Sequence, residues 1–173
     1  MMLAVNGIPV VAIELKNQLT GQTVDNAKLQ WQYDRDQREP AFWLNHRILA
    51  YFAVDLYEAW MATELKGANT YFLPFNQGSN GAGNDGGAGN PQTKDGDYIT
   101  SYIWENVLQK DSLLDIIQKF ISFEVKSEKK NGKNVTKKRL IFPRFHQLDV
   151  VRKLIADVRE NGSGNNYLIQ HSA

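Results

Sequence analysis

The feature that most constrains this chain is a short apolar run that ends in two charges. Residues 9–16 read Pro-Val-Val-Ala-Ile-Glu-Leu-Lys and follow an Asn-Gly turn pair. Their β-branched content and short length predict a β-strand. Because side chains alternate along a strand, Glu14 and Lys16 lie on the same face. A carboxylate and an ammonium group are therefore expected to emerge together from an otherwise buried strand.

The composition is that of a folded chain without cysteine chemistry. The 173 residues are 42% hydrophobic and 23% charged, which fits one globular domain with an appended piece and excludes disorder. The absence of cysteine excludes disulfides and thiolate zinc sites, and it favours a reducing compartment such as the cytoplasm. With a formal net charge of +1, attraction to nucleic acid must come from local patches. The longest apolar stretch, residues 48–54, is too short to span a membrane.

A helix is expected soon after the first strand. Thr23 is a suitable N-cap, and an apolar stripe at helical spacing runs to about residue 36. Gln30 and Tyr33, three residues apart, share one side of this helix. Residues 42–66 fit a helical period, but residues 48–54 also fit a buried strand. The pattern alone leaves this stretch open.

The second half of the chain predicts a loop and then a helix. Residues 76–91 hold six of the 13 glycines among Asn, Ser and Asp, and this composition predicts a mobile loop. Ser112 and Asp115 have the spacing of a capping box, which predicts that a helix begins there. The apolar residues of that helix are Leu113, Leu114, Ile117 and Phe120.

A hairpin and a second helix are expected to follow. Residues 121–130 and 135–142 flank the turn pair Asn131-Gly132 and predict a β-hairpin rich in lysine. From Arg144 a helix is expected, and a short strand over residues 167–170 comes after it. The apolar face of the helix consists of Leu148, Val151, Leu154, Ile155 and Val158.

Glu14-Leu15-Lys16 is the most informative triplet for function. Nucleases of the PD-(D/E)xK kind hold Mg²⁺ with a carboxylate on a strand. A lysine two residues later, on the same face, positions the attacking water and stabilises the developing charge. The spacing in this chain meets that geometric demand. Taken alone, it also fits a plain ion pair at the end of a strand.

Residues 6–17, Asn-Gly-Ile-Pro-Val-Val-Ala-Ile-Glu-Leu-Lys-Asn, resemble the nuclease motif of the restriction (motor) subunit of type I restriction-modification enzymes. The similarity continues in the same order at residues 52–56, 70–76, 104–111, 145–147 and 167–173. The resemblance implies an α/β fold with a mixed β-sheet flanked by helices, of the PD-(D/E)xK restriction-endonuclease-like kind. It also implies strands at residues 48–54 and 57–63, which resolves the open middle of the chain.

The resemblance assigns roles to five residues. It implies that Glu14 and Lys16 are catalytic, that Glu14 is a ligand of Mg²⁺, and that Gln30 and Tyr33 support the site or contact DNA. Gln147 matches a glutamine that reads the adenine of ATP in such motor subunits, through an amide that both donates and accepts. The other interpretation of Gln147 is a solvent-facing residue at the start of a helix.

Two departures from the family lead us to expect a fragment truncated at both ends. No acidic residue precedes Glu14, where the family carries its first metal-binding aspartate. No glycine-rich G-K-[ST] element follows residues 167–173. Residues 1–143 are then an endonuclease-like domain without its N-terminal part. Residues 144–173 are the first helix and strand of a RecA-like helicase motor.

The function implied by the resemblance is Mg²⁺-dependent cleavage of DNA, coupled in the full protein to ATP-dependent translocation. The isolated fragment is expected to be inactive, and its expected partners are DNA and the methylation and specificity subunits of the type I complex. The alternative is a non-catalytic module that binds DNA or a subunit through the hairpin and the glycine-rich loop. The basic residues of the hairpin either contact DNA or are only solvated. They are Lys126, Lys129, Lys130, Lys133, Lys137, Lys138 and Arg139.

Overall fold

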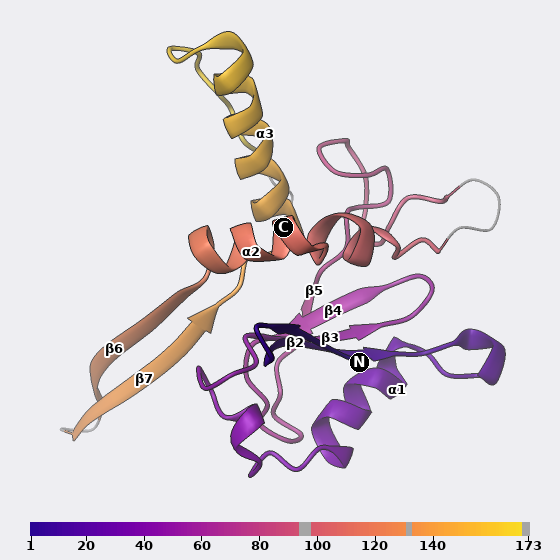
Figure 1. Cartoon of the computed structure of the whole chain (residues 1–173), viewed down its shortest axis with the longest axis vertical. Helices are drawn as coiled ribbons and strands as arrows, with labels where there is room; N and C mark the ends of the chain where they lie inside the picture. The colour runs from indigo at the N-terminus through magenta and orange to yellow at the C-terminus, as the bar shows by residue number, and fades with distance from the viewer. Residues whose placement is uncertain (94–97, 131–132, 171–173) are drawn as a thin grey trace.

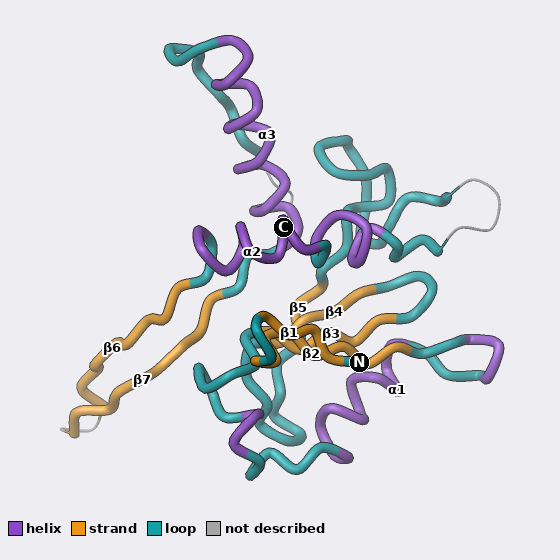
Figure 2. Tube along the Cα trace, in the orientation of Figure 1, coloured by secondary structure: helices purple, strands orange, loops and turns teal. Residues whose placement is uncertain are grey.

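Five strands form the central sheet of the computed structural model (Figures 1 and 2), which describes residues 1–93, 98–130 and 133–170. The strand order follows the chain, β1-β2-β3-β4-β5. Only β2 and β3 pair in parallel, and the other neighbours pair antiparallel. The strands are β1 (Met2–Val5), β2 (Ile8–Leu15), β3 (Ala50–Val54), β4 (Ala59–Ala62) and β5 (Leu73–Pro74).

Helices cover both faces of this sheet (Figure 1), so the predicted α/β fold with a mixed sheet flanked by helices is confirmed. α1 (Val24–Leu29) lies on one face, and α2 (Lys110–Lys119) packs on the other. The core on the α1 face includes Ala12, Ala27, Trp31, Tyr51 and Ala53. The core on the α2 face includes Val11, Ile13, Phe52, Phe75, Ile116 and Leu148.

The middle of the chain forms the predicted pair of strands. Every residue of β3 is buried, because the strand has a core on each of its faces. Burial on both faces explains why apolar and polar residues do not alternate along this strand. β4 returns antiparallel to β3 across the turn at Asp55 and Leu56.

The helix after the first strand begins as predicted. Thr23 is its N-cap, and its backbone N–H donates to Asn26 Oδ1 at 2.9 Å. The regular α-helix ends at Leu29 and continues as a wider π-helical turn, Gln30–Asp34. The buried Trp31 lies in this turn, and its indole N–H donates to the carbonyl of Phe52 at 3.0 Å.

The predicted start of α2 is wrong. A π-helical turn, Ile103–Val107, precedes the helix, which begins at Lys110 with the extended Gln109 as its N-cap. The Gln109 side chain accepts from the backbone N–H of Asp111 at 3.0 Å. Ser112 instead lies buried within the helix, where its hydroxyl donates to the Val107 carbonyl at 2.7 Å. Leu114 is 41% exposed, and Ile116, which the pattern omitted, is fully buried.

The lysine-rich hairpin forms as predicted, and it projects from the body of the molecule (Figure 1). Its strands are β6 (Ser122–Lys130) and β7 (Lys133–Ile141), paired antiparallel. The predicted turn pair, residues 131–132, lies outside the described residues.

α3 (Phe145–Asn161) begins directly after Arg144, as predicted. Leu148 at its start is buried in the core on the α2 face, whereas Ile155 and Val158 are about 40% exposed. The apolar face of α3 is thus buried at its first turn, partly buried at Val151 and Leu154, and exposed at Ile155 and Val158. The division of the chain at residues 143 and 144 into two domains stays a prediction.

The predicted strand over residues 167–170 does not form. None of the described strands lies beside this segment to complete its backbone hydrogen bonds. The glycine-rich segment is a loop, as predicted, and it carries internal hydrogen bonds such as Gly78 N–H to the Gly89 carbonyl at 2.8 Å. Within the described part of the chain, no helix has the length and apolar character that crossing a bilayer requires.

Candidate functional site

The candidate site lies at the carboxyl end of β2, on the sheet face that α1 covers. Glu14 and Lys16 share that face with Ala12, which packs in the core beneath α1. Their side chains are only 14% and 11% exposed. The Lys16 ammonium lies 3.5 Å from Glu14 Oε1. Two charged groups are therefore held almost entirely within the protein, where water screens their interaction less than at an open surface.

Gln30 connects the end of β2 to the π-helical turn that follows α1. The Lys16 ammonium donates to Gln30 Oε1 at 2.5 Å. Gln30 is the first residue of the π-helical turn, so this turn presents its amide to the end of β2. The structure thus brings together three of the residues that the sequence analysis singled out. The ammonium is thus held by a neutral amide on one side and a carboxylate on the other.

Tyr33 lies on the rim of the site and does not enter its centre. Its side chain is 65% exposed. With Lys16 and Gln30 it lines an open groove, whose other lining residues are Gln22, Asn26, Leu29 and Asp34. The groove thus offers a polar ligand amide and hydroxyl groups beside one ammonium, that of Lys16, and one carboxylate, that of Asp34.

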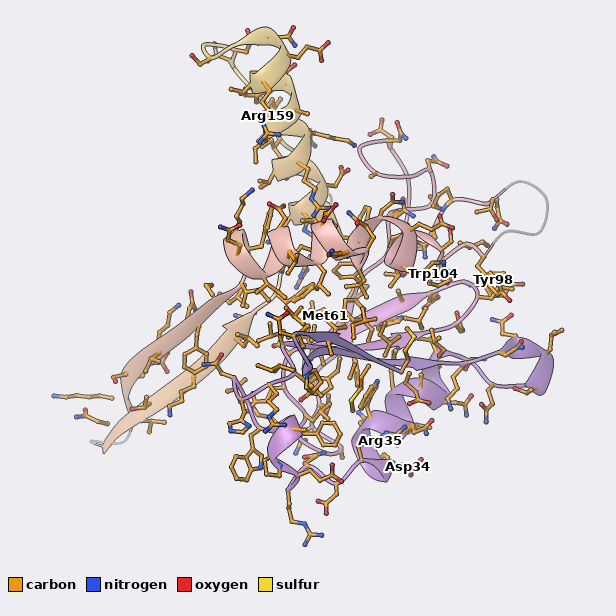
Figure 3. All side chains as sticks on the ribbon, in the orientation of Figure 1. Asp34, Arg35, Met61, Tyr98, Trp104 and Arg159 are labelled. Carbon is orange, nitrogen blue, oxygen red and sulfur yellow. The ribbon has the colours of Figure 1, made fainter. Side chains whose placement is uncertain are left out.

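Arg35 is a member of the site that the sequence analysis missed. Its guanidinium Nη2 donates to Glu14 Oε2 at 2.8 Å, and its Cζ lies 5.6 Å from the centroid of the Trp31 ring. Figure 3 shows Arg35 and Asp34 at the far end of the α1 segment. No pattern in the sequence marks Arg35, because its pairing depends on the π-helical turn that precedes it.

Asp55 is a second residue whose role the sequence analysis missed. Its buried carboxylate follows β3 directly and accepts three backbone N–H groups, those of Val24, Tyr57 and Glu58, at 2.8–2.9 Å. One side chain therefore fixes the β3–β4 turn and the start of α1. An aspartate between a buried strand and a turn is the signal that could have found it.

The described residues do not fit a divalent cation in this arrangement. They contain no group of three or more histidine, cysteine, aspartate or glutamate side chains placed to hold a metal. The two oxygens of Glu14 face the cations of Arg35 and Lys16. Asp55 at the neighbouring strand end is engaged by backbone N–H groups. Mg²⁺ needs oxygen ligands that are free to approach it.

Gln147 lies apart from this site. It is exposed in the first turn of α3, which begins on the α2 face of the sheet. Its Oε1 accepts from the backbone N–H of Arg144 at 3.0 Å, so the side chain caps its own helix. The structure does not bring Gln147 together with Glu14.

The chain was compared with protein-family models, with curated proteins and with solved structures, and none of them matches it.

Proposed function

We propose that the chain is the nuclease-type part of a DNA-cleaving restriction (motor) subunit of a type I restriction-modification enzyme, with a PD-(D/E)xK-like fold. The observation that carries the proposal is the position of Lys16. Its ammonium lies between Glu14 and Gln30 at the end of a buried strand. An isolated ion pair at a strand end would not need the amide of a neighbouring helix to hold its cation.

The chemistry follows from the fixed cation. Cleavage of a phosphodiester places additional negative charge on the phosphate oxygens in the transition state. A preorganised ammonium stabilises that charge without reorganising during the reaction. Lys16 is the group that does this, and Gln30 keeps it in place. Tyr33, on the rim of the groove, contacts the DNA strand.

Further parts of the proposal rest on the sequence resemblance. Mg²⁺ is the proposed cofactor and Glu14 its proposed ligand, but both oxygens of Glu14 are paired with Lys16 and Arg35, and the described residues contain no group of three metal-binding side chains. ATP is the proposed cofactor of the motor part, in which Gln147 is the proposed adenine contact. The proposed partners are DNA and the methylation and specificity subunits, and the proposed location is the cytoplasm.

The test is the substitution Glu14→Ala in the complete reading frame that encodes this chain. DNA cleavage is expected to disappear while ATP hydrolysis stays at the level of the unmodified protein. Asp85→Ala, which removes an exposed loop carboxylate, is the matched control and retains both activities. Cleavage at the unmodified rate by the Glu14→Ala protein refutes the assignment of the site.

A specific observation favours a second candidate function, a non-catalytic module that binds DNA through the β6–β7 hairpin. The hairpin carries seven basic and two acidic residues, which gives it a charge of +5. Lys126 and Lys137 pair with Glu124 and Glu128, and Lys137 holds the pKa of Glu128 below its usual range. A projecting two-stranded ribbon of this charge fits the major groove of DNA.

Charge reversal tests this second function. The triple substitution Lys129→Glu, Lys138→Glu and Arg139→Glu changes cations that have no acidic partner among the described side chains. It is expected to lower duplex affinity at least tenfold and to reduce its salt dependence. A single change at the paired Lys137, the control, has a smaller effect. Unchanged affinity in the triple variant rules out the hairpin as the DNA-binding surface.

A further inference from the structure

The two faces of the β6–β7 hairpin differ in their chemistry. The strands pair in unbroken register, with Val125 opposite Lys138 and Ser127 opposite Thr136. Side chains alternate along each strand, and residues directly opposite each other point to the same side. One side, named here the acid-free face, consists of Phe123, Val125, Ser127, Lys129, Asn134, Thr136, Lys138 and Leu140. The other side, named here the ion-paired face, carries Glu124, Lys126, Glu128, Val135, Lys137 and Arg139.

The lysines of the ion-paired face have carboxylates of the same face as partners. Lys126 Nζ lies 3.4 Å from Glu124 Oε2, and Lys137 Nζ lies 2.6 Å from Glu128 Oε2. The hydrogen bond from Lys137 holds the pKa of Glu128 below its usual range, so this carboxylate stays ionised at neutral pH. A phosphate group that approached this face would meet two carboxylates, and their repulsion would offset much of the attraction of the lysines.

The acid-free face carries positive charge without any carboxylate among its described residues. Lys129 and Lys138 are exposed and have no acidic partner among the described side chains. Ser127, Asn134 and Thr136 are exposed as well, and their hydroxyl and amide groups can both donate and accept hydrogen bonds. The outer half of this face therefore presents two ammonium groups together with three neutral polar side chains.

This combination of groups fits the major groove of double-stranded DNA. The groove is about 12 Å wide and admits a two-stranded β-ribbon. Lysines bind the phosphates that border it, and asparagine, serine and threonine bind the base edges on its floor. The hairpin projects from the body of the molecule, which leaves its outer part accessible to a duplex (Figure 1).

We infer that the acid-free face, and not the ion-paired face, enters the major groove of double-stranded DNA. Lys129 and Lys138 then bind phosphates, and Asn134 and Thr136 face the base edges. This inference rests on the second candidate function, because it takes the hairpin as the DNA-binding surface, and it adds the face that makes the contact. The effect of an added charge then depends on the face that carries it.

Two substitutions at neighbouring positions of β7 test the inference. Thr136→Glu and Val135→Glu each add one negative charge at an exposed position, but on opposite faces. Binding of the purified 173-residue chain to a fluorescein-labelled DNA duplex is measured by fluorescence anisotropy. Thr136→Glu is expected to lower the affinity about tenfold and Val135→Glu less than about twofold, because only the first carboxylate would face the DNA. Circular dichroism checks that both variants keep the fold.

The outcomes separate the failure of this inference from the failure of the second candidate function. An equal loss of affinity in the two variants, or a larger loss in Val135→Glu, overturns the inference and leaves the hairpin as the DNA-binding surface. Unchanged affinity in both variants also overturns the inference. If the triple charge-reversal variant described above binds unchanged as well, the second candidate function is refuted with it.

Lysine reactivity in the unmodified chain covers the case in which a variant does not fold. The chain is acetylated with and without the duplex, and mass spectrometry gives the rate at each lysine. With about nine-tenths of the chain bound, Lys129 and Lys138 are expected to react about tenfold more slowly, because only the unbound chain exposes them. Lys126 and Lys137 are expected to keep their rates. Equal protection of all four lysines, protection of Lys126 and Lys137 alone, or protection of none overturns the inference.

Discussion

At the scale of single residues, Asp55 does the most to position the site. Its carboxylate joins the end of β3 to the first residue of α1 by accepting the Val24 N–H at 2.9 Å. It also accepts the N–H groups of Tyr57 and Glu58, both at 2.8 Å. Because α1 leads directly into the turn that carries Gln30, the position of Gln30 beside Lys16 depends on this carboxylate.

We predict that Asp55→Ala lowers the free energy of unfolding by about 2–4 kcal/mol, because three backbone N–H groups lose their acceptor. Urea unfolding followed by circular dichroism measures the change. Asp85→Ala, which removes a carboxylate on the exposed loop, is the control and is expected to change the free energy by less than about 0.5 kcal/mol. Equal stability of the two variants would contradict the role given to Asp55.

The sequence analysis identified the site residues that fit a regular strand or helix spacing. It missed the site residues whose role depends on the tertiary structure. Glu14 and Lys16 follow from the alternation of a strand, and Gln30 from helical spacing combined with the resemblance. Arg35 reaches Glu14 only because the helix widens into a π-helical turn before it. The contacts of Asp55 with the turn are local, but its contact with Val24 at the start of α1 joins residues 31 positions apart and has no local signature.

At the scale of elements, the Arg152 side chain joins α3 to α2. Arg152 Nη2 donates to the buried Ser112 hydroxyl at 2.7 Å and lies 3.6 Å from Asp115 Oδ2. Lys119 and Arg152 together hold the pKa of Asp115 below its usual range. The outer part of α3, where Figure 3 shows Arg159, lies away from the sheet.

We predict that Arg152→Ala raises the amide hydrogen-exchange rates of α3 about 5- to 30-fold, as expected for the loss of about 1–2 kcal/mol of local stability. Mass spectrometry of peptic peptides measures the rates. Arg159→Ala, in the exposed last turn of the same helix, is the control. If both variants exchange alike, Arg152 does not hold α3 to α2.

The start of α2 and the predicted strand at residues 167–170 show why local sequence patterns misplace some elements. The spacing of Ser112 and Asp115 imitates a capping box, but the helix begins at Lys110 with Gln109 as its N-cap, and the serine lies buried within it. Residues 167–170 have the composition of a strand, but a strand needs a neighbour, and none of the described strands supplies one. The hairpin was predicted correctly because its turn pair and its two flanking runs are all local signals.

At the scale of the whole molecule, the buried tyrosines link stability to pH. Tyr51 and Tyr102 donate their phenol groups to the carbonyls of Phe42 and Phe75, and burial raises the pKa of both phenols above the usual value. The folded state therefore favours the neutral phenol. The stability that this contributes is complete below about pH 10 and is lost progressively as the pH rises above it.

We predict that part of the tyrosinate absorbance appears only when the fold is lost during alkaline titration. Tyr51 and Tyr102 are expected to ionise together with unfolding, with the ellipticity falling at the same pH. Complete ionisation of the tyrosines while the ellipticity stays unchanged would contradict the burial of Tyr51 and Tyr102.

The whole architecture was more predictable than its details. The pattern predicted the first strand and the helix after it, and the resemblance implied the strand at residues 48–54; the structure pairs these two strands in parallel, in a sheet covered on both faces. The antiparallel strands around this pair make the sheet mixed, as the resemblance implied. The two-faced core explains why β3 carries no alternation and why pattern analysis alone left that stretch open.

The rate of DNA cleavage by the Lys16→Ala protein tests the proposed site most directly, because the proposal rests on the position of that ammonium. The substitution is made in the complete reading frame, and a single turnover is followed. Loss of a preorganised charge is expected to slow cleavage by about 10²–10³-fold. Lys28→Ala, which removes a partly buried lysine of α1, is the control and is expected to cleave normally. Cleavage by Lys16→Ala at the unmodified rate would show that the Glu14-Leu15-Lys16 triplet is only an ion pair at the end of a strand.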